Sequence, residues 1–294
     1  GLSVVQREAV FTAITGPQAA RALTVLGRAN AHRSEAAGLI EDALAAAPVT
    51  MAGAVIVTAT RFPGVFAARC AQVLAAARIE LAELVELARL VPYPSLELAC
   101  VGLVLEERIV AHPDLAAASP ERGTWLNSFA VRLAETGRHT EALTTSNEAL
   151  TLYRELAATN RDAHLPDLAA SVNNHALRLA ETGRHTEALT TSNEALTLYR
   201  ELAATNRDAY LPDLANTLDT TGMVYLTIGG PLDFAAAAAG EAVRLFVEVA
   251  AREPGAFTGK LRSAAAMLAD IHDARNSPAE AAEIRIRYGV QEPR

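Results

Sequence analysis

The stretch "RLAETGRHTEALTTSNEALTLYRELAATNRDA" occurs twice without a change, at Arg132–Ala163 and again at Arg178–Ala209. The two copies begin 46 residues apart. Ala, Leu, Glu and Arg dominate both copies, and these residues favour the helix. An exact repetition at this spacing predicts an array of like helical units.

Each unit is predicted to be a helical hairpin. Pro166 and Asp167 suit the first turn of a helix A that continues to about Glu181. Gly183, in Thr182–Arg184, is free to take the left-handed conformation that ends many helices. Helix B follows with one buried stripe, formed by Ala188, Leu189, Ser192, Ala195, Leu196, Tyr199, Leu202 and Ala203. A single hairpin leaves the flanks of both helices wet, so successive hairpins are expected to stack.

The small residues of this unit resemble those of the tetratricopeptide repeat. That family places Gly or Ala in helix A, Gly at the turn and two Ala in helix B. The matching residues are Ala130, Gly137, Ala142 and Ala149 in the first copy, then Ala176, Gly183, Ala188 and Ala195. A third copy has Gly222, Tyr225 and Gly229, one extra residue in Gly230–Pro231, then Ala235 and Ala242, and a weaker fourth copy covers Phe257–Tyr288.

The period exceeds the family's usual 34 residues. We expect the surplus in a longer helix B and in the connection Ala204–Leu211. The long period and the stretch "SVNNHALRLAETGR" resemble the repeats of kinesin light chains. "LYRELA" and "PDLA" are similar to segments of actinobacterial signalling proteins of the STAND type, in which the array follows a nucleotide-driven switch module. The resemblance implies an all-α, right-handed α-solenoid of stacked antiparallel hairpins.

Two regions are expected. Residues 113–294 form the array of about four hairpins, and residues 1–112 form a degenerate helical-repeat region. Residues 1–112 contain the pattern of one hairpin with a shortened turn, formed by Leu26, Gly27, Ala36, Ala43 and Pro48. Helices are also expected at Pro63–Arg78, Leu81–Leu90 and Ser95–Ala111. These helices either continue the solenoid or form a compact helical domain against which the repeats stack.

Composition limits the partners. The formal net charge of −8, with 26 basic residues interleaved among 34 acidic ones, argues against nucleic acid. Leu44–Thr60 carries no charge, but Pro48 divides it, so a buried helix is expected there rather than a membrane span. Cys70 and Cys100 are expected to be free thiols in the cytoplasm. No secretory signal is evident, but the chain opens with Gly1 rather than Met, so we expect an excised piece of a longer protein.

No motif for chemistry emerges, so we expect no enzyme, no cofactor and no metal. "GAFTGKL" at Gly255–Leu261 has one residue too few for a phosphate loop, and Leu261 replaces the magnesium-binding hydroxyl residue. The seven histidines are scattered singly. His139 and His185 are expected to be exposed, and His175 to be a neutral, hydrogen-bonded core histidine.

The resemblance implies a binding groove along the A helices. Its expected residues are Thr124, Asn127, Ser128, Val131 and Glu135, then Asn173, Asn174, Leu177 and Glu181, then Asn216, Asp219, Thr220, Met223 and Leu226. The fifth positions read Asn127, Asn173 and Asp219. Carboxamides there could hold the backbone of an extended peptide in any sequence, with Val131, Leu177 and Met223 as apolar contacts.

The function expected is a protein- or peptide-binding scaffold, as the recognition or autoinhibitory segment of a bacterial signalling or defence protein. Three alternatives stay open: the asparagines merely bridge adjacent repeats, the chain is a self-assembling scaffold, or an enzyme site lies in the N-terminal helices. A homo-oligomer or a flanking switch domain is also possible. Internal duplication explains the unchanged polar residues, such as Thr190, Thr191, Asn193 and Arg200, which packing alone does not require.

Overall fold

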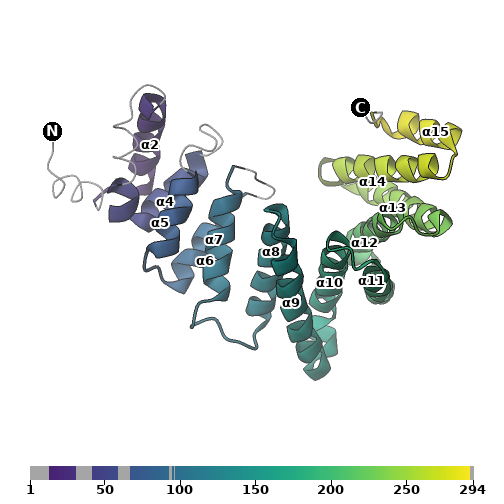
Figure 1. Cartoon of the computed structure of the whole chain (residues 1–294), viewed down its shortest axis with the longest axis horizontal. Helices are drawn as coiled ribbons and strands as arrows, with labels where there is room; N and C mark the ends of the chain where they lie inside the picture. Colours follow the sequence, from purple (N-terminus) through teal and green to yellow (C-terminus); the bar gives the residue numbers. More distant parts are fainter. Residues whose placement is uncertain (1–12, 31–41, 59–66, 93–94, 96, 292–294) are drawn as a thin grey trace. The chain divides into compact units, whose positions relative to one another are not determined.

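The computed structural model describes residues 13–30, 42–58, 67–92, 95 and 97–291, with the side chains of residues 26–30 left out. Its helices are α2 (Gly16–Asn30), α4 (Pro48–Thr58), α5 (Ala67–Ala76), α6 (Leu81–Leu90), α7 (Ala99–Val110), α8 (Pro120–Glu135), α9 (His139–Thr159), α10 (Arg161–Glu181), α11 (His185–Thr205), α12 (Arg207–Thr227), α13 (Leu232–Arg252), α14 (Pro254–Ala274) and α15 (Pro278–Tyr288). The described residues contain no strand (Figure 1). The chain divides into two compact units, residues 1–138 and 139–294.

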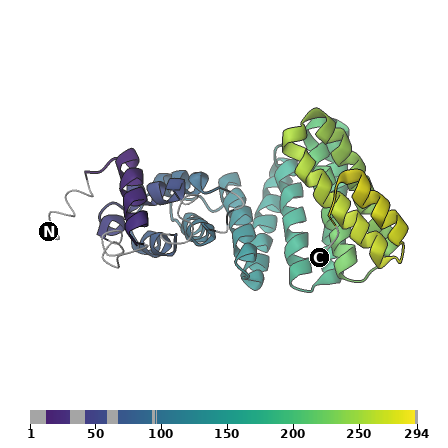
Figure 2. The ribbon, with the colours of Figure 1, turned by 90° about the horizontal axis from the view of Figure 1, so that it is seen from above.

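The second unit is built of antiparallel hairpins, as predicted. Each of its helices packs against the next along the chain, from α9 to α15, and α12 also contacts α10 and α14 (Figure 2). The small residues expected at the helix crossings are buried: Ala142, Ala149, Ala176, Ala188, Ala195, Ala235 and Ala242 are all fully inaccessible. A Cβ on Gly222 would lie 3.3 Å from the Cβ of Ala239, so α12 and α13 approach too closely there for a larger side chain. The buried stripe predicted for helix B is confirmed in α11, with Leu189 half-buried.

The turns of the hairpins share one backbone motif. At Gly183 the φ angle is +76°, the amide of Gly183 donates to the carbonyl of Ala180, and the amide of Arg184 donates to that of Leu179. This Schellman pair of hydrogen bonds satisfies carbonyls that the helix end leaves free. The same pair occurs at Gly137, Gly229 and Asn276. Asn276 therefore supplies the turn of the fourth copy, which the sequence pattern placed only approximately.

Helix A is longer than predicted. It begins at Arg161 rather than Pro166, because the side chain of Asn160 caps it by accepting the amide of Ala163 at 3.3 Å. Pro166 then lies inside the helix and leaves one backbone carbonyl without its helical donor. The surplus over the usual period therefore lies in a lengthened helix B, as expected, and also in a lengthened helix A, because the two 21-residue helices α11 and α12 are joined by the single residue Asn206 and not by a long connection.

Ion pairs connect successive repeats of the second unit. Arg154 of α9 binds both carboxylate oxygens of Glu194 in α11 at 3.0 and 2.9 Å, and Arg161, the first residue of α10, binds Glu201 of α11. One repeat later, Arg200 and Arg207 bind Glu241 and Glu248 of α13. The spacing lengthens from 40 to 41 residues because of the extra residue at Gly230–Pro231. Arg154 and its equivalent Arg200 therefore do have a structural role, since each forms an ion pair with the following repeat, and the expectation that internal duplication alone explains them was wrong.

The first unit has a core contributed by α2, α4, α5, α6 and α7, against which Trp125 of α8 packs. The predicted Leu81–Leu90 matches α6, and Ser95–Ala111 contains α7. Pro63–Arg78 contains α5, but residues 59–66 lie outside the described part, as do Ala36 and the side chain of Leu26. The uncharged stretch forms α4, of which six residues are buried. Across the described residues, no helix combines the length and apolarity that a bilayer span requires.

We expect Gly183→Ala to lower the free energy of unfolding by about 1 kcal/mol, because an alanine at φ +76° is strained. Gly259→Ala is the matched control, since its Cβ would meet no atom within 4 Å on an exposed face of α14. That control should stabilise the chain by about 0.5–1 kcal/mol. Thermal unfolding followed by circular dichroism measures both, and an equal effect of the two substitutions would contradict the role of the turn.

We expect a double-mutant cycle on Arg161→Ala and Glu201→Ala to give a small but measurable favourable coupling, since both side chains are about half exposed to water. Raising NaCl to about 1 M should remove most of this coupling, because salt screens exposed charges. Arg161→Lys should keep part of it. A coupling that did not change with salt would show that the two residues interact through packing instead.

Candidate functional site

The expected groove residues of the second unit lie on α10 and α12, two A helices in contact with each other. Most of these side chains are half-buried, namely Asn173, Asn174, Leu177, Asn216, Asp219, Thr220, Met223 and Leu226. Glu181 is exposed. The remaining expected residues lie on α8 in the first unit, where Asn127, Ser128 and Val131 are half-buried and Thr124 and Glu135 are exposed.

Two equivalent positions of the second unit hold unsatisfied acceptors. The Oδ1 atoms of Asn173 and Asp219 are both buried, and no donor in the described part of the chain reaches either one. Asn173 and Asp219 lie one period apart, at the same position of α10 and α12. A buried acceptor without a donor costs about 1–3 kcal/mol. At this position, α10 and α12 therefore each have one acceptor that an N–H donor from outside the described residues could satisfy.

The charge of Asp219 adds to this demand. Burial raises the pKa of the Asp219 carboxyl to about 6, from an ordinary value of 3.8. Burial also raises the pKa of Asp213 on the same helix, where the Lys260 ammonium opposes the rise. At neutral pH Asp219 is ionised, and its carboxylate is poorly solvated.

Other predicted groove residues are engaged within the unit. Asn216 Oδ1 accepts the ammonium of Lys260 in α14 at 3.3 Å, so this asparagine bridges adjacent repeats. Glu181 binds Arg178 at 3.1 Å and lies 3.4 Å from His139 Nδ1. The bridging alternative thus describes Asn216, whereas the Oδ1 atoms of Asn173 and Asp219 have no such contact among the described residues.

In the first unit, one expected groove residue serves the interior instead. The hydroxyl of Ser128 donates to Glu106 Oε1 at 2.9 Å, and Arg132 Nε donates to the same oxygen at 3.2 Å. Glu106 and Arg132 are almost fully buried between α7 and α8. Burial raises the pKa of Glu106, and the contacts with Arg132 and Ser128 oppose that rise.

Sequence analysis missed this buried ion pair. Two features of the sequence could have indicated it. The first is Gly102, which has no side chain and so leaves room for Arg132: a Cβ there would lie 3.0 Å from the guanidinium. Glu106 was the second indication, as a carboxylate within the largely apolar helix α7. Arg132 belongs to the repeated passage, but Glu106 does not, so the period could not reveal the pair.

His175 is a hydrogen-bonded core residue, as expected. Its Nδ1 lies 2.9 Å from the Ser146 hydroxyl, and burial is the main cause of its lowered pKa, so the ring is neutral. In the next copy Thr221 replaces the histidine and donates to the carbonyl of Thr217, and Ser192 Oγ is left without a partner in the described residues. His139 is exposed, but the expectation for His185 was wrong, since it is half-buried. His139 lies against Glu181, and the position equivalent to Glu181 for His185 is Thr227, so the two rings have different neighbours.

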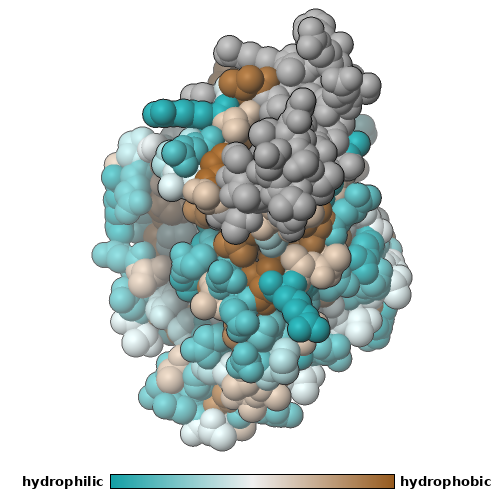
Figure 3. Space-filling view, turned by 90° about the vertical axis from the view of Figure 1, so that its left-hand side faces the viewer, coloured by the Kyte–Doolittle hydropathy of each residue, from teal (hydrophilic) through white to brown (hydrophobic). Residues whose placement is uncertain are grey.

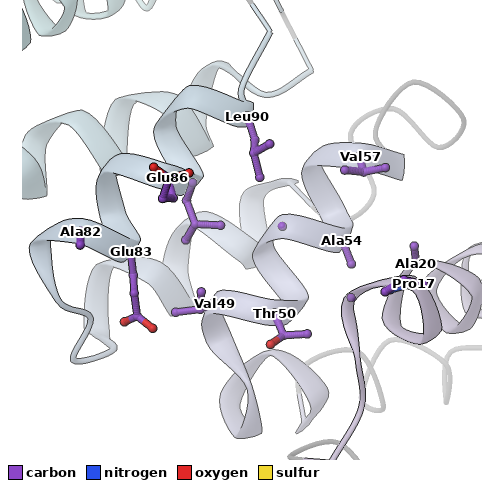
Figure 4. Close-up of a pocket in the computed structure, with 13 residues that line it drawn as sticks. Pro17, Ala20, Val49, Thr50, Ala54, Val57, Ala82, Glu83, Glu86 and Leu90 are labelled. Atoms are coloured by element: carbon purple, nitrogen blue, oxygen red, sulfur yellow. The ribbon is translucent and has the colours of Figure 1, made fainter.

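The first unit also contains an apolar cavity of about 670 Å³ between α2, α4 and α6 (Figure 4). Its lining is Gly16, Pro17, Ala20, Val49, Thr50, Gly53, Ala54, Val57, Ala82, Glu83, Glu86, Leu87 and Leu90. Both glutamates already have contacts, Glu83 with the amide of Glu80 and Glu86 with Arg89. The lining of this cavity contains no nucleophile paired with a base.

Figure 3 shows one face of the molecule, on which apolar side chains gather near the centre among hydrophilic ones.

Among the described residues, no group of three or more His, Cys, Asp or Glu side chains could hold a metal ion. Cys70 and Cys100 are free thiols, and burial raises the pKa of Cys70 to about 12. The Cys70 thiol is therefore protonated and unreactive.

No family model and no curated protein matches the chain. Solved structures do. A single-substitution form of a putative kinesin light chain from Podospora anserina with nearly identical TPR-like repeats is 21% identical, with 72% of this chain and 96% of that chain covered and a TM-score of 0.51. BtubC (BKLC) from P. vanneervenii is 16% identical, with 84% and 93% covered and a TM-score of 0.52. The fold is therefore that of a kinesin-light-chain-like tetratricopeptide-repeat array.

Proposed function

We propose that the chain binds an extended segment of another protein along α10 and α12. The observation that carries this proposal is the pair of buried, unsatisfied oxygens on Asn173 and Asp219, one per repeat at the same position. An extended peptide presents backbone N–H groups at regular intervals, and such groups could satisfy both acceptors when the half-buried side chains of Asn173 and Asp219 rotate toward the partner. We propose the same role for Thr124, Asn127, Val131 and Glu135 on α8 within the first unit.

Apolar contacts flank these acceptors. Leu177 follows Asn173 by one helical turn, and Met223 follows Asp219 by the same interval, so each pair shares a face of its helix. Both apolar side chains are half-buried and thus partly open to a partner. Methionine is flexible and polarisable, which suits contacts with more than one side chain. The backbone of the partner would contact the polar position Asn173, and side chains of the partner would contact Leu177 and Met223.

The proposed role is that of an interaction scaffold. The tetratricopeptide-repeat fold is generally used for protein–protein interaction, and this supports the role. A place in the cytoplasm, supported by the two free thiols, is part of the proposal. The proposal also includes a role as the recognition or autoinhibitory segment of a bacterial signalling or defence protein. This part rests on the resemblance of "LYRELA" and "PDLA" alone.

To test the groove, a phage-displayed library of random 12-residue peptides is selected on the immobilised chain, and the selected peptides are synthesised and titrated by fluorescence anisotropy. We expect Asn173→Ala to weaken their binding about fivefold to tenfold, the worth of one hydrogen bond. Asn193→Ala, on an exposed face of α11, is the matched control and should have no effect. Failure to select any peptide, or full affinity of a folded Asn173→Ala variant, would overturn the proposal.

We expect Asp219→Asn to stabilise the free chain by about 1–2 kcal/mol at pH 7.5, since the raised pKa reports an ionised carboxylate that folding desolvates. The folded state binds the Asp219 proton more tightly than the unfolded state, so the cost appears as pH rises from about 4 to about 6. The gain should therefore shrink as pH falls through this range. Thermal unfolding from pH 4 to 8 measures it, with Asp167→Asn, on an exposed face of α10, as the control that should show no such gain.

A further inference from the structure

The position of Asn173 in α10 is occupied by Asp219 in α12. Both side chains are half-buried, and both have a buried Oδ1 without a donor among the described residues. The difference between them is one negative charge. A backbone amide of a partner could satisfy the oxygen of Asn173 fully, but it would leave the charge of Asp219 without a counterion.

Lys260, which contacts α12 three residues before Asp219, does not pair with the Asp219 carboxylate. Lys260 donates to Asn216 and acts on the charge of Asp213, at the first part of α12. Burial is the one cause of the raised pKa at Asp219, and no charged side chain in the described residues contributes to it. The carboxylate thus has no counterion among the described residues of the second unit, and its Oδ1 has no donor there.

Several other carboxylates of this unit have arginine partners. On α13, Glu241 and Glu248 are bound by Arg200 and Arg207. Asp208, at the start of α12, is bound by Arg252. The closest parallel lies on α14, where the nearly buried Arg285 binds Asp270 at 2.9 Å and Asp273 at 2.7 Å. Asp219 stands apart from these carboxylates.

We infer that Asp219 selects a partner segment that carries an arginine where it crosses α12. This inference rests on the proposed function and names the chemistry of its ligand. A guanidinium has planar, forked N–H donors and is weakly hydrated, so it can bind both oxygens of the half-buried Asp219 carboxylate when that side chain rotates toward the partner. A lysine ammonium supplies the charge but not the fork. The net charge of −8 favours the approach of a cationic segment.

The test uses the same random peptide library on the full chain and on its Asp219→Asn variant, which keeps the shape of the side chain and removes its charge. Peptides selected on the unchanged chain should share an arginine at one position. Replacing that arginine by lysine should weaken binding severalfold, and replacing it by glutamine should weaken binding about tenfold or more. Asp219→Asn should weaken the arginine peptide to the same extent and leave the glutamine peptide unchanged.

Asp167→Asn is the matched control, since this exposed carboxylate lies on α10 outside the groove positions, and it should not change the preference. Peptides that bind, depend on Asn173 and show no shared basic residue would overturn this inference and leave the proposed function standing. An arginine preference that persists in Asp219→Asn would do the same. Failure of the library to give any binder would overturn both. Equal circular dichroism spectra and thermal unfolding no lower than that of the unchanged chain establish that Asp219→Asn is folded.

Discussion

Close approach of neighbouring helices is the constraint on which the second unit depends. A hairpin cannot cover its own flanks, so α10–α11 needs other hairpins on both sides, and small buried residues such as Ala176, Ala188 and Gly222 lie where the helices approach. The Schellman turn at Gly183 fixes where one helix stops and the next begins. With helix length and turn both fixed, every repeat presents the same positions, and Asn173 and Asp219 fall in register.

The unchanged polar residues of the duplicated passage have two different fates. Arg154 and Arg200 occupy equivalent positions and form equivalent ion pairs, so repetition is compatible with a role in the fold. Ser146 and Ser192 are also equivalent, yet the first contacts His175 and the second has no partner among the described residues. The partner of each residue lies in the following repeat, where the sequences of α10 and α12 differ. Identity of sequence is therefore not identity of environment.

Stability and the proposed recognition conflict at Asp219. Folding desolvates this carboxylate, and no donor in the described part of the chain reaches its Oδ1, whereas Asn216 on the same helix accepts a hydrogen bond from Lys260. The buried pair Glu106 and Arg132 shows that the chain can accommodate a buried charge when it supplies the counterion. An unpaired, desolvated carboxylate lowers the free energy of unfolding. A partner that supplies a donor to it would recover that free energy as binding free energy.

The sequence alone determined the hairpin, its period, the glycine turn, the extra residue and the buried stripe of helix B. These features are local, because helical spacing and a left-handed glycine need no distant contact to be recognised. It misplaced the start of helix A, since Pro166 is tolerated inside a helix that Asn160 caps further upstream. Only the tertiary structure decided that Ser128 turns inward, that Asn216 bridges to Lys260 and that Asn173 and Asp219 remain unsatisfied. Hydrogen-bond satisfaction depends on side chains of other helices, which no period in one helix records.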